Sequence, residues 1–187
     1  MIPKRDECLK ILREHDVPEH IISHSLTVER VALFIAEEVN AALDKEDSRL
    51  DNDLISAGAL LHDIAKVKAM ETGEHHGMLG GKMVREIGFP EVADLVEQHI
   101  RLRSYDKNGR ISEAEVINYA DKRVTHDDVV TLSHRFSDIR RRYGKNSDEI
   151  FDRIDKTMEL TLIIERKIFD VIPIDPDDLV KMLELTD

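Results

Sequence analysis

The sequence predicts an all-α protein, in which a helical bundle is followed by a C-terminal helical extension. Apolar residues recur at spacings of three and four along most of the chain, and no stretch of any length shows the alternation of a strand. Only 4% of the residues are aromatic and Trp is absent. The core must therefore be built mainly from Leu, Ile, Val, Ala and Met, which suit helix-on-helix packing. A length of 187 residues suits one domain, over residues 1–187.

Two helices are expected at the N-terminal end. Residues 3–15 alternate charged and apolar side chains, which indicates a short amphipathic helix. Pro18 can open a second, longer helix. Its apolar face contains residues spaced three and four apart, namely Ile21, His24, Val28, Val31, Ile35 and Val39. The polar stretch over residues 41–53 indicates a connection.

A buried helix is expected over residues 53–67, which are apolar and rich in small side chains. Asp51 or Asn52 can cap its start. It ends in three polar residues, His62, Asp63 and Lys66. Residues 70–77 are polar and contain glycine, so they indicate another connection.

The next two helices carry their own start and stop signals. Residues 78–89 indicate a helix that stops near Gly88, and Pro90 opens the following one. One face of that helix contains Val92, Leu95, Val96 and His99. Residues 104–112 indicate a loop with an Asn-Gly turn. Ser112 and Glu115 then resemble a capping box, which opens a helix through Val116, Ile117, Ala120, Asp121 and Val124.

The chain changes character after residue 125, and we treat residues 126–187 as an extension. Residues 127–143 and 147–169 predict two helices, and a short one follows Pro176. The basic run over 134–145 is interpreted as a charged helix face, since few aromatic residues accompany it. These helices either pack on the bundle or form a surface for a partner, such as a second copy of the chain.

Composition argues against several classes of function. A net charge of −12 repels polyanions, so nucleic acid is not expected as a partner. A small phosphorylated substrate remains compatible, because a bound metal can reverse the local charge. No apolar stretch is long enough for a signal peptide or a bilayer span, so no membrane partner is expected. The single cysteine, Cys8, fits a reducing compartment, and we expect a cytoplasmic location.

Metal-capable residues lie on the apolar faces of four expected helices, where burial costs free energy unless the group is paired or metal-bound. They are His24, His62, Asp63, His99 and Asp121. One such histidine is most often a satisfied core residue, but five together are harder to explain in that way. Facing helices of a bundle often build metal sites. Imidazole with carboxylate suits first-row divalent ions such as Fe, Mn, Co or Zn.

The same residues resemble a known signature. His24 in HSLTVERVA, the doublet His62-Asp63 in GALLHDIAK and Asp121 in ADK are similar to the H…HD…D pattern of the HD-domain phosphohydrolase superfamily. The resemblance covers residues 20–125 and implies an all-helical metal-binding core. It is nearest to the HDIG type, which includes bacterial hydrolases of dinucleoside polyphosphates, although Ala65 stands in place of the glycine.

The resemblance also implies the ligand set. His24, His62, Asp63 and Asp121 would hold one metal. In branches with two metals, two further histidines take part, and His76 and His99 match them, with Asp63 bridging both ions; His75 is the alternative to His76. Ile100 replaces the second histidine that some branches place after the one matching His99, and no GYP motif of the cyclic-dinucleotide phosphodiesterases is present. The expected cofactor is one or two divalent ions, whether Fe, Mn, Co, Zn or Mg.

Three basic residues are candidates for substrate binding. Lys66 lies one helical turn after the doublet and can point toward the same cavity, so we assign it, with Asp63, to catalysis as well. Arg101 and Arg123 follow two of the ligands and can meet an anionic substrate. The alternatives are a solvated lysine, an exposed helix end and a surface salt bridge.

The sequence therefore predicts a metal-dependent phosphohydrolase that acts on a nucleotide or another small phosphate ester through metal-activated water. Phosphomonoesterase, phosphodiesterase and dinucleoside polyphosphate hydrolase activities remain open. The alternative is a nucleotide-sensing or signalling module with little catalytic activity.

Overall fold

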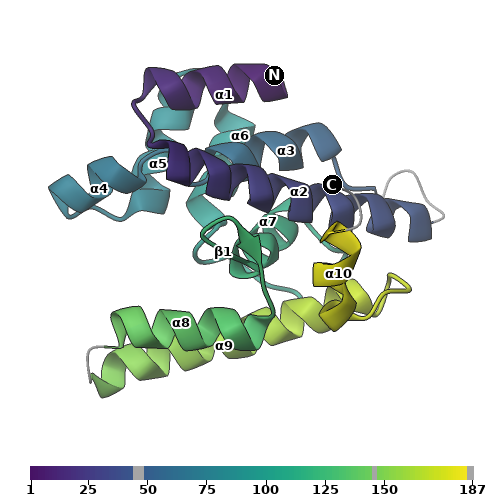
Figure 1. Cartoon of the computed structure of the whole chain (residues 1–187). Coiled ribbons are helices and arrows are strands. Elements are labelled where there is room, and N and C mark those ends of the chain that lie inside the picture. The colour runs from purple at the N-terminus through teal and green to yellow at the C-terminus, as the bar shows by residue number, and fades with distance from the viewer. Residues whose placement is uncertain (44–48, 145–146, 185–187) are drawn as a thin grey trace.

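The computed structural model describes residues 1–43, 49–144 and 147–184, and it confirms a predominantly helical fold with a C-terminal helical extension (Figure 1). In chain order the elements are α1 (Arg5–Glu14), α2 (Glu19–Ala42), α3 (Asn52–Leu61), α4 (Lys66–Thr72), α5 (His76–Glu86), α6 (Pro90–Gln98), α7 (Glu113–Lys122), β1 (Val124–Thr125), β2 (Asp128–Val129), α8 (Leu132–Tyr143), α9 (Asp148–Phe169), the 3₁₀ turn η2 (Pro176–Asp178) and α10 (Leu179–Glu184).

The expected caps are present at several helix starts. Asp51 rather than Asn52 caps α3, because its side chain accepts a hydrogen bond from the backbone N–H of Leu54. Ser112 and Glu115 form the complete capping box of α7. These bonds satisfy backbone donors that a helix leaves free in its first turn, so they set where the two helices begin.

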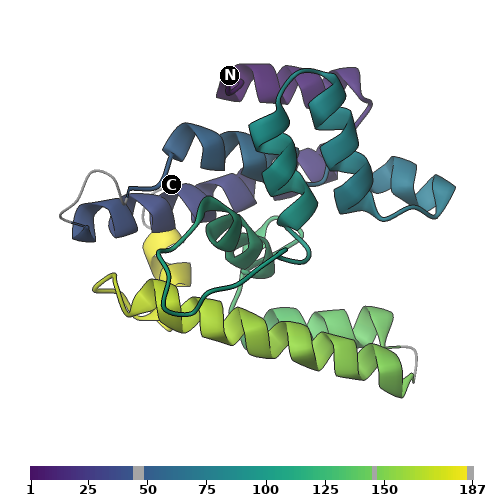
Figure 2. The same ribbon diagram turned by 180° about the vertical axis from the view of Figure 1, so that it is seen from behind.

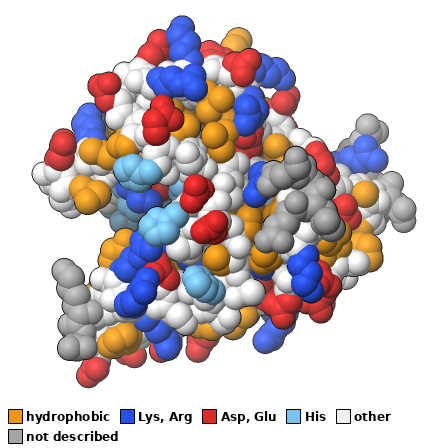
Figure 3. Space-filling model, in the orientation of Figure 1, with side chains coloured by type: hydrophobic (Ala, Val, Ile, Leu, Met, Phe, Trp, Pro, Cys, Tyr) orange, Lys and Arg blue, Asp and Glu red, His pale blue; other side chains and the backbone are white. Residues whose placement is uncertain are grey.

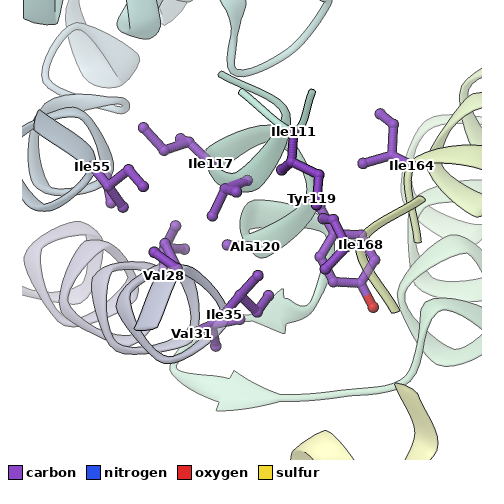
Figure 4. Packing of buried hydrophobic residues seen from close by; sticks show 14 of the residues in the cluster. Val28, Val31, Ile35, Ile55, Ile111, Ile117, Tyr119, Ala120, Ile164 and Ile168 are labelled. Atoms are coloured by element: carbon purple, nitrogen blue, oxygen red, sulfur yellow. The ribbon is translucent and has the colours of Figure 1, made fainter. Parts of the chain in front are cut away.

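Helix α2 runs through the middle of the bundle, and α3 and α7 pack against it. Its buried residues Val28, Val31 and Ile35 belong to one apolar cluster with Ile55 of α3 and Ile117 of α7, and Val28 faces the latter two (Figure 4). All five side chains have no exposed surface. Full burial of a side chain of this kind contributes about 1.5–3 kcal/mol to the stability of the fold. The packing of α2 against α3 and α7 therefore contributes strongly to the stability of the bundle.

Close packing between α3, α6 and α7 depends on Gly58. A Cβ atom at this position would lie 2.6 Å from Cδ1 of Ile117 and 3.0 Å from Cδ1 of Leu95. The small residues of this segment therefore allow the helices to approach, as the sequence predicted. On the other side of α3, α1, α5 and α6 enclose a second apolar cluster.

The extension shares the first cluster instead of building a separate core. Helix α9 buries Ile164 and Ile168 beside Ile111 and Tyr119 (Figure 4). The ammonium of Lys167 lies 2.8 and 2.9 Å from the two carboxylate oxygens of Glu115 in α7. Helices α8 and α9 pair with each other and lie along one side of the bundle in both views (Figures 1 and 2).

Three segments differ from the predicted pattern. The single helix expected over 53–67 is interrupted by a turn at residues 62–65, and α4 then continues into the stretch expected as a connection. Gly73 ends α4 in the left-handed conformation, with φ of 75°. The helix expected from residue 127 begins only at Leu132, because β1 and β2 form a small antiparallel hairpin that takes Val124 out of α7.

The connection expected over residues 41–53 is only partly described. Its first two residues belong to α2, and residues 44–48 lie outside the described part of the chain. Among the helices of the described residues, none is both long enough and apolar enough to span a membrane.

Candidate metal centre

Six candidate ligands meet at one place in the fold, where α2 passes the ends of several other helices. His24 comes from α2 itself, and Asp121 lies near the C-terminal end of α7. The interruption after α3 presents His62 and Asp63 as a pair at its first two positions. His76 is the first residue of α5 and His99 is the first after α6.

The first group of ligand atoms contains His24, His62 and Asp121. Oδ1 of Asp121 lies 3.3 Å from Nε2 of His24 and 3.8 Å from Nε2 of His62. The two imidazole rings are 5.4 Å apart between centroids. Three donor atoms from three parts of the chain therefore converge on one small volume.

The second group contains Asp63, His76 and His99. Oδ1 of Asp63 is 3.3 Å from Nε2 of His76 and 3.8 Å from Nε2 of His99, and these two nitrogens are 3.2 Å apart. The other carboxylate oxygen of Asp63 lies 3.4 Å from Nε2 of His62, which belongs to the first group. Asp63 thus lies between the two groups.

Backbone carbonyls orient three of the four imidazoles. Nδ1 of His24 lies 2.6 Å from the carbonyl oxygen of His126. Nδ1 of His62 lies 2.7 Å from the carbonyl oxygen of Ala59, and Nδ1 of His99 lies 2.6 Å from that of Val96. A hydrogen bond of this kind holds the proton on Nδ1 and leaves Nε2 free to bind a metal.

The chemistry of the donor set fits one or two divalent metal ions. Nε2 of His62 is fully buried and has no hydrogen-bond partner in the described structure, an arrangement that is costly unless another group binds there. Imidazole nitrogens with carboxylate oxygens suit first-row divalent ions.

The ionisation states of the carboxylates also suit a metal. Burial opposes the charge of Asp63, but His62, His76 and Lys66 outweigh it and hold the pKa of that carboxyl well below its ordinary value. Burial likewise opposes the charge of Asp121, whose pKa is nevertheless lowered, chiefly by Lys122. Both side chains are therefore anionic near neutral pH.

The pKa values of two imidazoles shift in opposite directions. Burial, followed by the neighbouring His62, lowers the pKa of His99 to about 3, so this ring stays neutral and free to coordinate. For His62 burial also opposes the charge, but the adjacent Asp63 carboxylate raises the pKa. Metal binding at His62 therefore competes with a proton.

The three substrate-binding candidates lie in different surroundings. Nζ of Lys66 is 2.5 Å from Oδ2 of Asp63, and the lysine borders a cavity of about 610 Å³ between α4 and α8. Arg101, two residues beyond His99, is exposed. The structure does not bring Arg123 to the site, because its buried guanidinium binds elsewhere. Its partners are the Tyr119 hydroxyl and the carbonyls of Val130 and Pro176.

Sequence reasoning missed two cations beside the ligands. Nζ of Lys122 donates to the carbonyl of His99 at 2.6 Å and lies 3.2 Å from Oδ2 of Asp121, so it links two ligand segments. Nη2 of Arg135 lies 4.0 Å from Oδ1 of Asp121. The sequence predicts a charged helix face for the basic run of α8, and no local signal distinguishes Arg135 from its neighbours. A larger hollow of about 880 Å³, bordered mainly by α2 and α3, includes none of the six ligands.

The chain is similar in sequence to a known family and to several known proteins. The sequence model described as "HD domain" matches residues 21–125, which include all six candidate ligands. A tRNA (cytidine(56)-2'-O)-methyltransferase of Picrophilus torridus is 27% identical over 184 residues, covering 91% of this chain and 50% of that protein. The Thermoplasma volcanium protein of the same name is 33% identical over 101 residues, covering 54% of this chain and 27% of its own length.

The chain thus spans half or less of these methyltransferases. An uncharacterized protein of Methanocaldococcus jannaschii is 29% identical over 151 residues, covering 71% of this chain and 82% of that protein. No solved structure matches the chain.

Proposed function

The chain belongs to the HD-domain family, and from this premise we propose that it is a metal-dependent phosphohydrolase acting on a small phosphate ester such as a nucleotide. The observation that carries the proposal is the convergence of six donors in two adjoining groups, at whose junction the buried Nε2 of His62 has no hydrogen-bond partner among the described residues. A structural metal site alone has no need of the open cavity that adjoins them.

The proposed metal ligands divide into two sets. His24, His62 and Asp121 would hold one divalent ion, His76 and His99 would hold a second, and Asp63, whose two carboxylate oxygens approach both groups, would serve either ion. Such ions, when bound, supply Lewis-acid chemistry that acidifies water and offsets charge on a phosphoryl group. The fold contributes largely buried surroundings, in which backbone carbonyls orient His24, His62 and His99.

Two lysine side chains provide the other contacts of the proposed site. Lys66 extends from the first position of α4 toward Asp63 and borders the cavity, so its ammonium can bind a phosphoryl oxygen of the substrate. Lys122 holds the His99 backbone and the Asp121 carboxylate together, and we assign it a positioning role. Preorganised charges of this type stabilise the charge of the transition state without rearrangement.

A metal analysis followed by a hydrolysis screen tests the proposal. The purified chain is loaded with Mn²⁺, Co²⁺, Fe²⁺ or Zn²⁺ and assayed for phosphate release from nucleotides, dinucleoside polyphosphates and simple phosphate esters. We expect turnover with at least one ion, and its loss in Asp63→Asn. Metal binding and nucleotide binding without turnover would support the sensing module instead.

A second candidate substrate is a phosphate on RNA. The two methyltransferase relatives are named for tRNA, and one of them aligns with nearly the whole chain. The net charge of −12 opposes contact with a long polyanion, so only a terminal phosphate is compatible. Adding short oligoribonucleotides with 5′ or 3′ phosphates to the screen separates this substrate from free nucleotides.

A further inference from the structure

The cavity beside the first group of ligands has walls from distant parts of the chain. His24 and Ile21 of α2 and Lys66 of α4 border one side, and residues of α8 border the other. Figure 3 shows histidine, Lys and Arg side chains gathered around a hollow on this face, between the part carrying α4 and the part carrying α8. The volume of about 610 Å³ accommodates a molecule of nucleotide size.

One end of this cavity is cationic. Arg135 is 18% exposed, and its Nη2 lies 4.0 Å from Oδ1 of Asp121, beyond hydrogen-bond distance. Its Nε is buried without a hydrogen-bond partner among the described residues. Arg135 lines the cavity and its side chain is only partly buried, so an anionic oxygen that enters the cavity can accept hydrogen bonds from the accessible part of the guanidinium.

A second arginine of α8 is held at the cavity wall. Nε of Arg142 is 2.8 Å from Oδ2 of Asp138, and Nη2 donates to Nε2 of His126 at 2.9 Å. The carbonyl of His126 in turn contacts Nδ1 of His24. Helix α8 is therefore tied to a candidate metal ligand through the β1–β2 turn, which fixes the position of the cavity wall.

The remaining lining side chains are two polar ones, His20 and Glu71, and three apolar ones that are exposed. Among the described residues, eight large apolar side chains are exposed, and three of them line this cavity. They are Val67, 38% exposed, Met70, 82% exposed, and Tyr143, 60% exposed. A methionine and an aromatic ring beside a cationic end suit the flat face of a nucleobase.

We propose that this cavity is a subsite for a phosphorylated nucleoside, in which Arg135 binds the phosphate and Met70 and Tyr143 contact the base. The inference rests on the proposed function and narrows its substrate class to phosphate esters that carry a base. Helix α8 lies outside the residues matched by the HD-domain model, so Arg135 and Tyr143 come from the extension, whereas Met70 of α4 belongs to the matched part. The phosphorylated nucleoside is either free or the end of an RNA strand.

Matched substrates with and without a base test the subsite. The metal-loaded full chain is assayed with the four nucleoside 5′-monophosphates, with ribose 5-phosphate, and with a short RNA that ends in a phosphate. We expect kcat/KM for the best base-bearing substrate to exceed that for ribose 5-phosphate by at least about tenfold. Tyr143→Ala and Met70→Ala should reduce this ratio, and comparable rates for substrates with and without a base would overturn the assignment.

The phosphate contact is tested with variants of α8. Arg135→Gln should lower kcat/KM by about ten- to a hundredfold for all these substrates, and Arg135→Lys should restore part of it. Arg141→Gln is the control, because Arg141 is on the same helix, pairs with Asp138 and does not line the cavity. Circular dichroism verifies that Arg135→Gln is folded. If its kcat/KM then equals that of Arg141→Gln, the proposed phosphate contact is wrong.

The proposed subsite and the proposed hydrolysis can be tested independently of each other. If the metal-loaded protein hydrolyses no phosphate ester, the proposed function fails, and the subsite is then tested by calorimetric titration of the same protein with adenosine 5′-monophosphate. Binding that weakens at least about tenfold in Arg135→Gln supports the subsite without turnover. Equal binding by Arg135→Gln and Arg141→Gln overturns it.

Discussion

Replacing His76 separates the two groups of ligands and tests whether the centre holds two metals. His76 contributes Nε2 to the second group and none of its atoms to the first. Its side chain is 32% exposed, so the substitution His76→Ala removes little buried contact. We expect the wild-type chain to bind two divalent ions and His76→Ala to bind one, because the first group remains intact.

The size of the effect follows from binding linkage. An ion present at a hundred times its dissociation constant stabilises the folded state by about 2.7 kcal/mol. For a chain of this size, 1 kcal/mol shifts the melting temperature by about 2–4 °C. Each bound ion should therefore raise the melting temperature by about 5–11 °C, and His76→Ala should lose one such increment.

The assay combines metal analysis with melting curves recorded with chelator and with added Mn²⁺ or Co²⁺. His75→Ala is the matched control, since His75 is exposed and stacks on His76 at 5.9 Å between ring centroids without joining either group. If His76→Ala keeps two ions and the full metal-dependent rise, the dinuclear arrangement is refuted, while a mononuclear centre built on the first group would survive.

Three further predictions address the site and its support. Lys66→Ala should slow hydrolysis by about one to two orders of magnitude and leave metal content unchanged, while Lys68→Ala, which alters an exposed neighbour, should have no effect; normal turnover in Lys66→Ala would remove that residue from the mechanism. Arg123→Met should lower the free energy of unfolding in urea by about 3–5 kcal/mol, because it breaks the ion pair of the buried Arg123 guanidinium with Glu165 and removes the donor to the carbonyls of Val130 and Pro176; a loss within experimental error would contradict this. In the metal-free protein the lowered pKa values of Asp63 and Asp121 stabilise the fold above the ordinary carboxyl value of 3.8, and this contribution should be lost as the pH falls below it; acid titration followed by circular dichroism should show a smaller loss in the double variant with Asn at both positions.

Local sequence was sufficient for most of the helices and for five of the six candidate ligands, whereas His76 was identified through the family resemblance. Periodic apolar residues predicted α2, and cap residues such as Asp51 and Ser112 predicted where α3 and α7 begin. These signals depend on neighbours within a few positions, so a single sequence contains them. His24 and Asp121 were recognisable because each interrupts an apolar face, where a polar side chain needs a compensating partner.

Other features depended on contacts between residues distant in the chain. The turn at residues 62–65 interrupts an apolar pattern that is continuous in sequence, and it places His62 in the first group and Asp63 in the second. Arg123 and Arg135 have the same side chain and both lie close to the ligand region in sequence, yet one is buried against Tyr119 and Pro176 while the other faces the cavity. Their surroundings arise only when α8 and the C-terminal segment pack on the bundle. The sequence alone therefore determined which residues have metal-binding chemistry, and the tertiary structure decided which charges meet them, because burial and distance are properties of the packed chain.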